Sequence, residues 1–147
     1  DNQIWKAENF EAKIMHIPGH TSGHICFHFF KEKIIFTGDT LFSLGCGRIF
    51  EGSYEQMFES LNRIKVLPKE TKIYCGHEYT LNNARFCEKY DSKNKNLQKK
   101  IEKIEKQLKD GIPTIPSILK DELDCNIFLR ANDIESFSKL RDLKDNF

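Results

Sequence analysis

The sequence predicts a layered α/β fold in which short strands dominate the first part and helices the second. Up to about residue 80, short runs rich in β-branched and aromatic residues end at Gly, Pro or charged turns, as strands do. Beyond that point hydrophobic residues recur at helical spacing instead. The 147 residues, 39% of them hydrophobic, suffice to bury the core of such a fold.

Four strands and one helix are predicted in the first part. The strand-like runs cover residues 12–17, 25–30, 33–37 and 71–74. Ser53 is a good N-cap, and the hydrophobic residues from Met57 to Ile64 recur at helical spacing until Pro68 ends the segment. Strands that alternate with a helix in this way indicate helices layered on a sheet.

Three helices are predicted in the second part. The first frays at Tyr90, and Gly111 stops the second, which carries a narrow apolar stripe of Leu97, Ile101, Ile104 and Leu108. The last helix begins after Asp133, a good N-cap, and runs to the end of the chain. No low-complexity linker separates residues 1–80 from residues 81–147, so we expect these two parts to pack together.

The composition excludes two classes of partner. Lys and Arg number 23 against 22 Asp and Glu, and the resulting charge of +1 creates no field that would attract nucleic acid or an anionic membrane. The charge-dense residues 93–109 are interpreted as a solvated helix face. No apolar run approaches the roughly 18 residues that a membrane span requires. We therefore expect neither nucleic acid nor a membrane among the partners.

The five cysteines indicate a reducing environment. Their number is odd and none has CxxC spacing, so we interpret them as free thiols. Cys26 and Cys75 lie in strand-like runs, where a thiol acts as a small buried apolar residue. We expect a cytoplasmic location, and an organelle stays an alternative because any targeting segment before Asp1 would be invisible here.

Four of the five histidines recur at intervals of four residues, a spacing that would align them on one face of a helix. They are His16, His20, His24 and His28. Pro18 lies inside this run with two glycines, and in a helix interior the proline costs about 3 kcal/mol and each glycine about 1 kcal/mol. We therefore expect a strand, a loop over residues 18–24 and a second strand. Only the loop histidines are free to face a site, whereas His16 and His28 should be half-buried on strands.

Three segments share one architecture, in which a strand leads into a glycine turn with a potential ligand at its tip. The ligands are His20, Asp39 and His77, each directly after a glycine. A glycine lets the backbone turn sharply, so the three tips can converge at one sheet edge. Imidazole nitrogen and carboxylate oxygen are ligands that hold zinc, iron or manganese at hydrolytic centres. On the residues alone this interpretation and a purely structural one both stay open.

Five motifs appear in an order that resembles glyoxalase II, the hydroxyacylglutathione hydrolases of the metallo-β-lactamase superfamily. They occupy residues 18–24, 36–42, 45–48, 51–52 and 74–80, and the tail 140–147 looks like the closing helix of that family. The resemblance implies that residues 1–80 form the second half of a metallo-β-lactamase αββα sandwich. Residues 81–147 would then form a C-terminal α-helical domain that binds glutathione.

The resemblance also implies the chemistry of the site. His20 would be a terminal ligand of one metal, His77 a terminal ligand of a second, and Asp39 the catalytic carboxylate that bridges both. The implied cofactors are two divalent metals, zinc first, with iron and manganese as alternatives. The implied reaction is hydrolysis of the thioester S-D-lactoylglutathione to D-lactate and glutathione by a metal-activated hydroxide. No protein nucleophile is needed, so the cysteines have no part in it.

The substrate side follows from the same resemblance. Arg48 stands where the family usually carries Lys, and either cation could meet glutathione. Phe50 stands where many members have Tyr, so this position keeps packing and loses a hydrogen bond. Tyr79 matches a family contact to glutathione.

Two further residues of the tail are implied to bind substrate. Arg141 and Lys144 lie one helical turn apart and would grip the glycyl carboxylate of glutathione. Arg141 has an alternative partner in Asp145, four residues further along the same helix.

One motif of the superfamily, Thr-His-x-His-x-Asp-His, is absent from the chain. It supplies three histidines and an aspartate, so His20, Asp39 and His77 alone should hold a dinuclear centre poorly. We therefore expect little thioesterase activity from these 147 residues alone, with a missing N-terminal segment as the partner that restores it. The alternatives are a fragment or pseudoenzyme that only binds glutathione, and another hydrolase or sulfur dioxygenase of the same superfamily.

Overall fold

The computed structural model describes residues 1–147, which fold around a six-stranded sheet with the order β1-β2-β3-β4-β7-β8. The strands are β1 (Ile4–Ala7), β2 (Phe10–His16), β3 (Ile25–Phe29), β4 (Ile34–Gly38), β7 (Lys72–Cys75) and β8 (Ser117–Ile118). Only β4 and β7 run parallel, and the small hairpin of β5 (Leu41–Phe42) and β6 (Gly45–Cys46) lies in the connection between them. The same connection contains α1 (Tyr54–Lys65).

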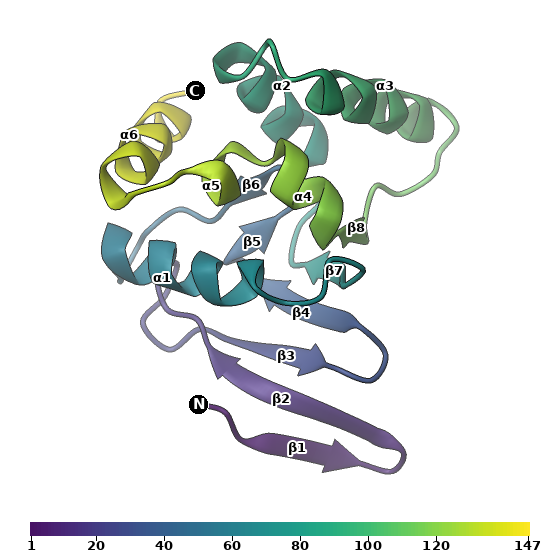
Figure 1. Cartoon of the computed structure of the whole chain (residues 1–147), viewed down its shortest axis with the longest axis vertical. Coiled ribbons are helices and arrows are strands. Elements are labelled where there is room, and N and C mark those ends of the chain that lie inside the picture. The colour runs from purple at the N-terminus through teal and green to yellow at the C-terminus, as the bar shows by residue number, and fades with distance from the viewer.

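The remaining helices follow β7 and gather at the end of the molecule opposite β1 (Figure 1). They are α2 (Thr80–Tyr90), α3 (Lys95–Lys109), α4 (Leu119–Cys125), α5 (Ile127–Arg130) and α6 (Ile134–Asp145). One cluster of 23 buried hydrophobic residues runs through both parts of the chain, from Met15 in β2 to Phe137 in α6. The expectation that the two parts pack together is therefore confirmed.

The predicted strands and helices are present within two residues of their expected limits. Ser53 caps α1 in a capping box with Gln56, and the Asp133 side chain accepts from the Ser136 N–H at the start of α6. His16 and His28 lie on β2 and β3 as expected, and burial lowers the pKa of His28. All five cysteines are free.

Six short elements were not predicted: β1, β5, β6, β8, α4 and α5. All have seven residues or fewer, and the strands of two residues exist only through their pairing with a neighbour. No helix of residues 1–147 combines the length and the apolar character needed to cross a membrane.

One face of the sheet carries a row of aromatic side chains. Trp5 meets Phe27 and Phe29 edge to face, Phe29 meets Phe36, and Phe36 stacks on Tyr74. Trp5 and Phe36 stay 40% and 45% exposed. The residues between them on the strands are buried on the other face, where the sheet contributes to the core.

Candidate metal and substrate site

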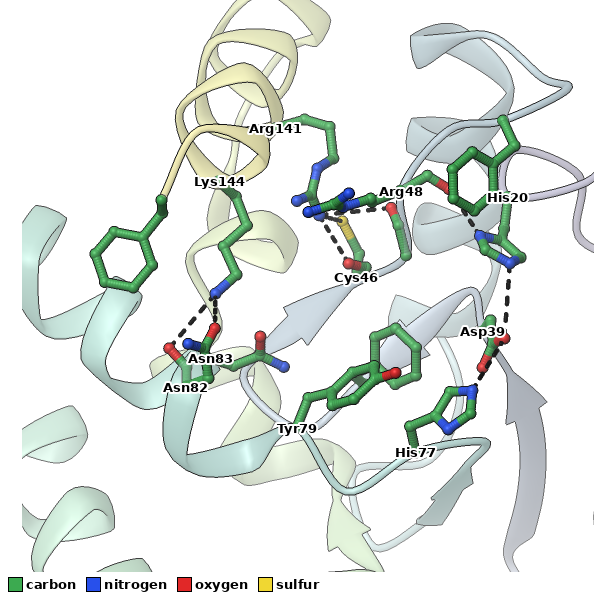
Figure 2. A pocket seen from close by; sticks show the side chains of 14 residues that line it. His20, Asp39, Cys46, Arg48, His77, Tyr79, Asn82, Asn83, Arg141 and Lys144 are labelled. Atoms are coloured by element: carbon green, nitrogen blue, oxygen red, sulfur yellow. Dashed lines mark hydrogen bonds and ion pairs between the residues drawn. The ribbon is translucent and has the colours of Figure 1, made fainter.

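The three predicted tips converge on one carboxylate. Asp39 Oδ2 lies 3.6 Å from His20 Nε2 and 3.6 Å from His77 Nε2 (Figure 2). Asp39 follows β4 directly and His77 follows β7 by two residues, and these parallel neighbours end at the same sheet edge. His20 reaches the same point from the loop between β2 and β3. The predicted convergence at one sheet edge is therefore confirmed.

Glycines around Asp39 allow the tips to approach so closely. Gly38 has φ +52°, a value that side chains disfavour, and this turn places Asp39 beyond the strand. A Cβ on Gly76 would lie 2.4 Å from Asp39 Oδ1, and one on Gly47 would lie 1.9 Å from the Asp39 carbonyl oxygen. Both positions have room for a glycine only.

Hydrogen bonds orient the side chains at this point. His20 Nδ1 lies 2.8 Å from the Arg48 carbonyl oxygen, and donation of its proton there leaves the Nε2 lone pair directed at Asp39. His24 Nε2 accepts from the Asp39 N–H at 3.2 Å. His24 thus holds the backbone of the turn that carries Asp39.

The donor set fits a divalent metal in chemistry and in spacing. Two ligands bound at about 2.1 Å with a tetrahedral angle lie about 3.4 Å apart, close to the observed separations. The single carboxylate oxygen therefore has the spacing to share an ion with each of the two imidazoles. Each ion would receive only two donors, one fewer than the three protein ligands of a catalytic zinc. Correspondingly, no group of three or more His, Cys, Asp or Glu side chains here closes around an ion.

A cavity of about 680 Å³ extends from these donors to a cluster of cations on α6. Tyr79 stands between the two ends, stacked on His77 at a centroid distance of 5.0 Å and half exposed. Phe50 packs on His20 at 5.1 Å and is 69% exposed. The predicted substrate contacts Arg48, Phe50 and Tyr79 all line the cavity.

The cationic end is built around Lys144. Its Nζ donates to Asn82 Oδ1 at 2.5 Å and lies over the rings of Phe86 and Phe147, about 5 Å from each centroid. Burial, followed by the positive charge of Arg141, lowers the pKa of Lys144 to about 8. This ammonium is therefore poorly solvated and faces a cavity that has room for an anionic group.

Arg141 borders the same cavity, but its donors are directed into the protein. The side chain is only 3% exposed, Nη1 donates to the Cys46 carbonyl at 2.8 Å, and Nη2 donates to Asp145 Oδ1 at 2.8 Å. The structure thus forms the intrahelical pair with Asp145 that was the alternative expectation. Arg48, by contrast, is 62% exposed and makes one long contact, 3.6 Å from Nε to Asp145 Oδ1.

Sequence reasoning missed several residues that shape the site. Asn82 holds Lys144, and Asn83 donates to the Ser43 carbonyl in the turn between β5 and β6. Glu122 is fully buried, accepts from the Leu44 N–H at 2.8 Å and has a pKa raised by burial. Asn82 and Asn83 lie two and three residues after the motif at residues 74–80, and this closeness was the one available signal. No local signal pointed to Glu122, because its partner Leu44 lies 78 residues away in the sequence.

Solved structures place this fold in a known class. The chain matches a crystal structure of ETHE1 from Myxococcus xanthus with a TM-score of 0.67 at 22% identity, covering 96% of this chain and 49% of that one. It matches a metallo-beta-lactamase from Staphylococcus aureus subsp. aureus COL with a TM-score of 0.63 at 21% identity, covering 97% and 41%. At these identities the likeness shows the fold alone, which is that of a metallo-β-lactamase, as predicted.

Sequence comparisons narrow the class to a family. The family model described as "Metallo-beta-lactamase superfamily" matches residues 6–77, and "Hydroxyacylglutathione hydrolase C-terminus" matches residues 78–147. A protein of Pelagibacter ubique (strain HTCC1062) named "Hydroxyacylglutathione hydrolase" is 64% identical over 147 residues. A protein of the same name from Methylococcus capsulatus is 42% identical over 161 residues. The chain is similar to hydroxyacylglutathione hydrolases along all of its 147 residues, and the predicted resemblance is confirmed.

All of the chain takes part in both matches, but it spans only 62% and 63% of these two relatives' own lengths.

Proposed function

We propose that this chain supplies three metal ligands and the glutathione-binding side of a hydroxyacylglutathione hydrolase. The reaction would be hydrolysis of S-D-lactoylglutathione to D-lactate and glutathione. One observation carries the proposal: a carboxylate oxygen 3.6 Å from two imidazole nitrogens opens into the same cavity as exposed and half-buried cations. A thioester held by the cations would present its reacting carbonyl toward that carboxylate.

At one end of the cavity, His20, Asp39 and His77 would hold two divalent metals, with Asp39 shared between them. Similarity to the metallo-β-lactamase superfamily and to hydroxyacylglutathione hydrolases supports divalent metals here, and nitrogen and oxygen donors suit zinc first, then iron and manganese. When bound, such a pair supplies Lewis acidity and a water of lowered pKa. The protein's part at this end is to keep both imidazoles and the carboxylate at fixed separations.

At the other end, Arg48 and Lys144 would bind the carboxylates of the glutathione part. Arg48 is exposed and offers a planar fork of donors, and Lys144 offers a point charge. Tyr79 and Phe50 would pack along the substrate between the two ends. These contacts need no metal, so substrate binding and metal binding should be separable.

The remaining metal donors would come from a complementing N-terminal segment. The support for this proposal is that each of the two proposed ions would have only two donors from this chain, and that the Pelagibacter ubique relative is longer than the match. The test is a lactoylglutathione assay of the purified chain with zinc, iron or manganese. It is run with and without the segment of the Pelagibacter ubique relative that lies outside the match.

We expect low turnover from the chain alone and higher turnover in the mixture, with Asp39→Asn at background in both. Two tightly bound metals per isolated chain together with turnover would contradict the proposed division of ligands. No turnover in any mixture would contradict the proposed hydrolysis of lactoylglutathione.

A second candidate is a protein that binds glutathione without hydrolysing its thioesters. The observation that favours it is the shortage of donors at the metal end beside a complete cationic end. Calorimetry with glutathione in the presence of a chelator would support this candidate if binding persists while every mixture stays inactive.

A further inference from the structure

The segment Cys46–Arg48, called the strap below, runs from the cationic end of the cavity to the metal end. At the first end the Cys46 carbonyl accepts from Arg141 Nη1 at 2.8 Å, and the Gly47 carbonyl lies 3.5 Å from the same nitrogen. At the other end the Arg48 carbonyl accepts the Nδ1 proton of His20 at 2.8 Å. The strap thus links a residue of α6 to a proposed metal ligand (Figure 2).

Arg141 is a rigid attachment for the strap. Its guanidinium is buried, lies 5.2 Å from the centroid of the Phe128 ring and is held by Asp145 Oδ1 at 2.8 Å. The same Asp145 oxygen lies 3.6 Å from Arg48 Nε. One turn of α6 therefore holds the first residue of the strap through Arg141 and the last through Asp145.

The strap has no free space on its metal side. The Gly47 N–H donates to the Thr40 carbonyl at 3.1 Å. A Cβ on Gly47 would lie 1.9 Å from the Asp39 carbonyl oxygen and 3.3 Å from His20 Nδ1. A shift of the strap must therefore move His20, Asp39 or both.

We propose that Arg141 is a positioning residue for His20. By holding the strap, it keeps the Arg48 carbonyl where it accepts the His20 Nδ1 proton, and this fixes the tautomer that presents the Nε2 lone pair to Asp39. The inference rests on the proposed function only for the role of His20 as a ligand. Lys144, one turn further along α6, contacts Asn82 and two aromatic rings and makes no contact with the strap.

The test reads the His20 tautomer by NMR in the full, metal-free chain labelled with ¹⁵N-histidine, at about two pH units above the ordinary imidazole pKa of about 6.5. In the unsubstituted chain we expect a single tautomer with the proton on Nδ1. Arg141→Met should produce a mixture of tautomers at His20. Arg141→Lys, which retains a donor and a positive charge, should restore most of the single form, and Lys144→Met is the matched control that leaves it unchanged.

Three results would overturn the proposal. They are an unchanged tautomer in Arg141→Met, an equal change in Lys144→Met, or an equal change at His16 and His28, which would mark a general loss of packing. Thermal unfolding checks that each variant is folded. If Arg141→Met is not folded, Asp145→Asn replaces it under the same criteria, because Asp145 Oδ1 holds both Arg141 Nη2 and Arg48 Nε.

The tautomer measurement needs neither metal nor substrate, so its failure is distinguishable from failure of the proposed hydrolysis. A second readout is metal affinity in the complemented protein. Because an outer hydrogen-bond partner of a ligand is worth about 10- to 100-fold in metal affinity, Arg141→Met should lose affinity in that range while Lys144→Met does not.

Discussion

The two ends of the cavity are built in different ways. The metal end consists of loop tips that follow strands, packed so closely around Asp39 that only glycines fit beside it. The cationic end consists of long side chains from α6 and the strap, held by Asn82, Asp145 and aromatic rings. The metal end is so closely packed that an added side-chain atom must displace its neighbours. At the cationic end, removal of one side chain should weaken binding only in part. Substitutions at the two ends should therefore differ in size and in the quantity they change.

Asp39→Asn should have the largest effect. The amide leaves the size of the side chain unchanged and removes the charge that both proposed ions would share. We expect the complemented protein to lose metal affinity and turnover by more than about 100-fold, the upper end of what a lost outer partner costs. Metal analysis after dialysis and a thioesterase assay measure this. Retention of two metals would show that Asp39 is not shared.

Gly76→Ala should destabilise the metal end through its backbone. The added Cβ would lie 2.4 Å from Asp39 Oδ1, and overpacking of this kind costs about 1–3 kcal/mol of unfolding free energy. Gly23→Ala is the matched control, because nothing lies within 4 Å of its Cβ. Denaturant unfolding measures both. Equal stabilities of the two variants would show that the tip can relax.

Lys144→Met should weaken substrate binding at the cationic end. A hydrogen bond to a charged group contributes about 1.5–3 kcal/mol, so KM for lactoylglutathione should rise about 10- to 100-fold. The turnover number should change little, because Lys144 does not contact the metal end. A drop in kcat with an unchanged KM would contradict the separation of the two ends.

The pH dependence of binding should report on the same lysine. The pKa of Lys144 is lowered to about 8, mainly by burial, so the cation is present below that value and is lost above it. Glutathione affinity should therefore fall as pH rises through about 8, and Lys144→Arg should remove this fall because Arg stays charged.

The contribution of Lys144 to the free energy of unfolding should rise with pH, whereas its contribution to glutathione affinity falls. The folded-state pKa lies below the reference value of 10.5, so the unfolded chain binds more protons between about pH 8 and 10.5. The contribution of Lys144 to stability therefore rises with pH across that window. Urea unfolding at about pH 8 and at about pH 10.5 measures this change in stability. Lys144→Met, which has no amine at this position, should not show the rise.

Phe50→Tyr should have the smallest effect. Phe50 is 69% exposed and packs on His20, so a hydroxyl at the ring edge meets solvent or substrate without strain. One added neutral hydrogen bond is worth about 1 kcal/mol, which corresponds to about a fivefold lower KM. A larger gain would mean that the substrate lies closer to Phe50 than to Tyr79.

The strand and helix limits could be predicted from the sequence because local signals agree there. Ser53 and Asp133 act as the expected caps, and the glycine turns carry His20, Asp39 and His77 to one place. In each case the signal is a capping residue or a glycine before the potential ligand, and it lies within a few residues of the helix or turn that it predicts.

Long-range contacts could not be predicted in the same way. The pairing of Arg141 with Cys46 spans 95 residues, and that of Glu122 with Leu44 spans 78. Helical spacing placed Arg141 beside Lys144 correctly, but spacing does not show which side chain is buried. Arg141 is buried and forms structural contacts, whereas Lys144 faces the cavity.

Calorimetry of glutathione binding to the metal-free chain tests most directly whether the two ends act separately. Asp39→Asn should bind glutathione as the unsubstituted chain does, and Lys144→Met should bind it about 10- to 100-fold more weakly. Loss of binding in Asp39→Asn, or full binding in Lys144→Met, would contradict the assignment of substrate binding to the cationic end.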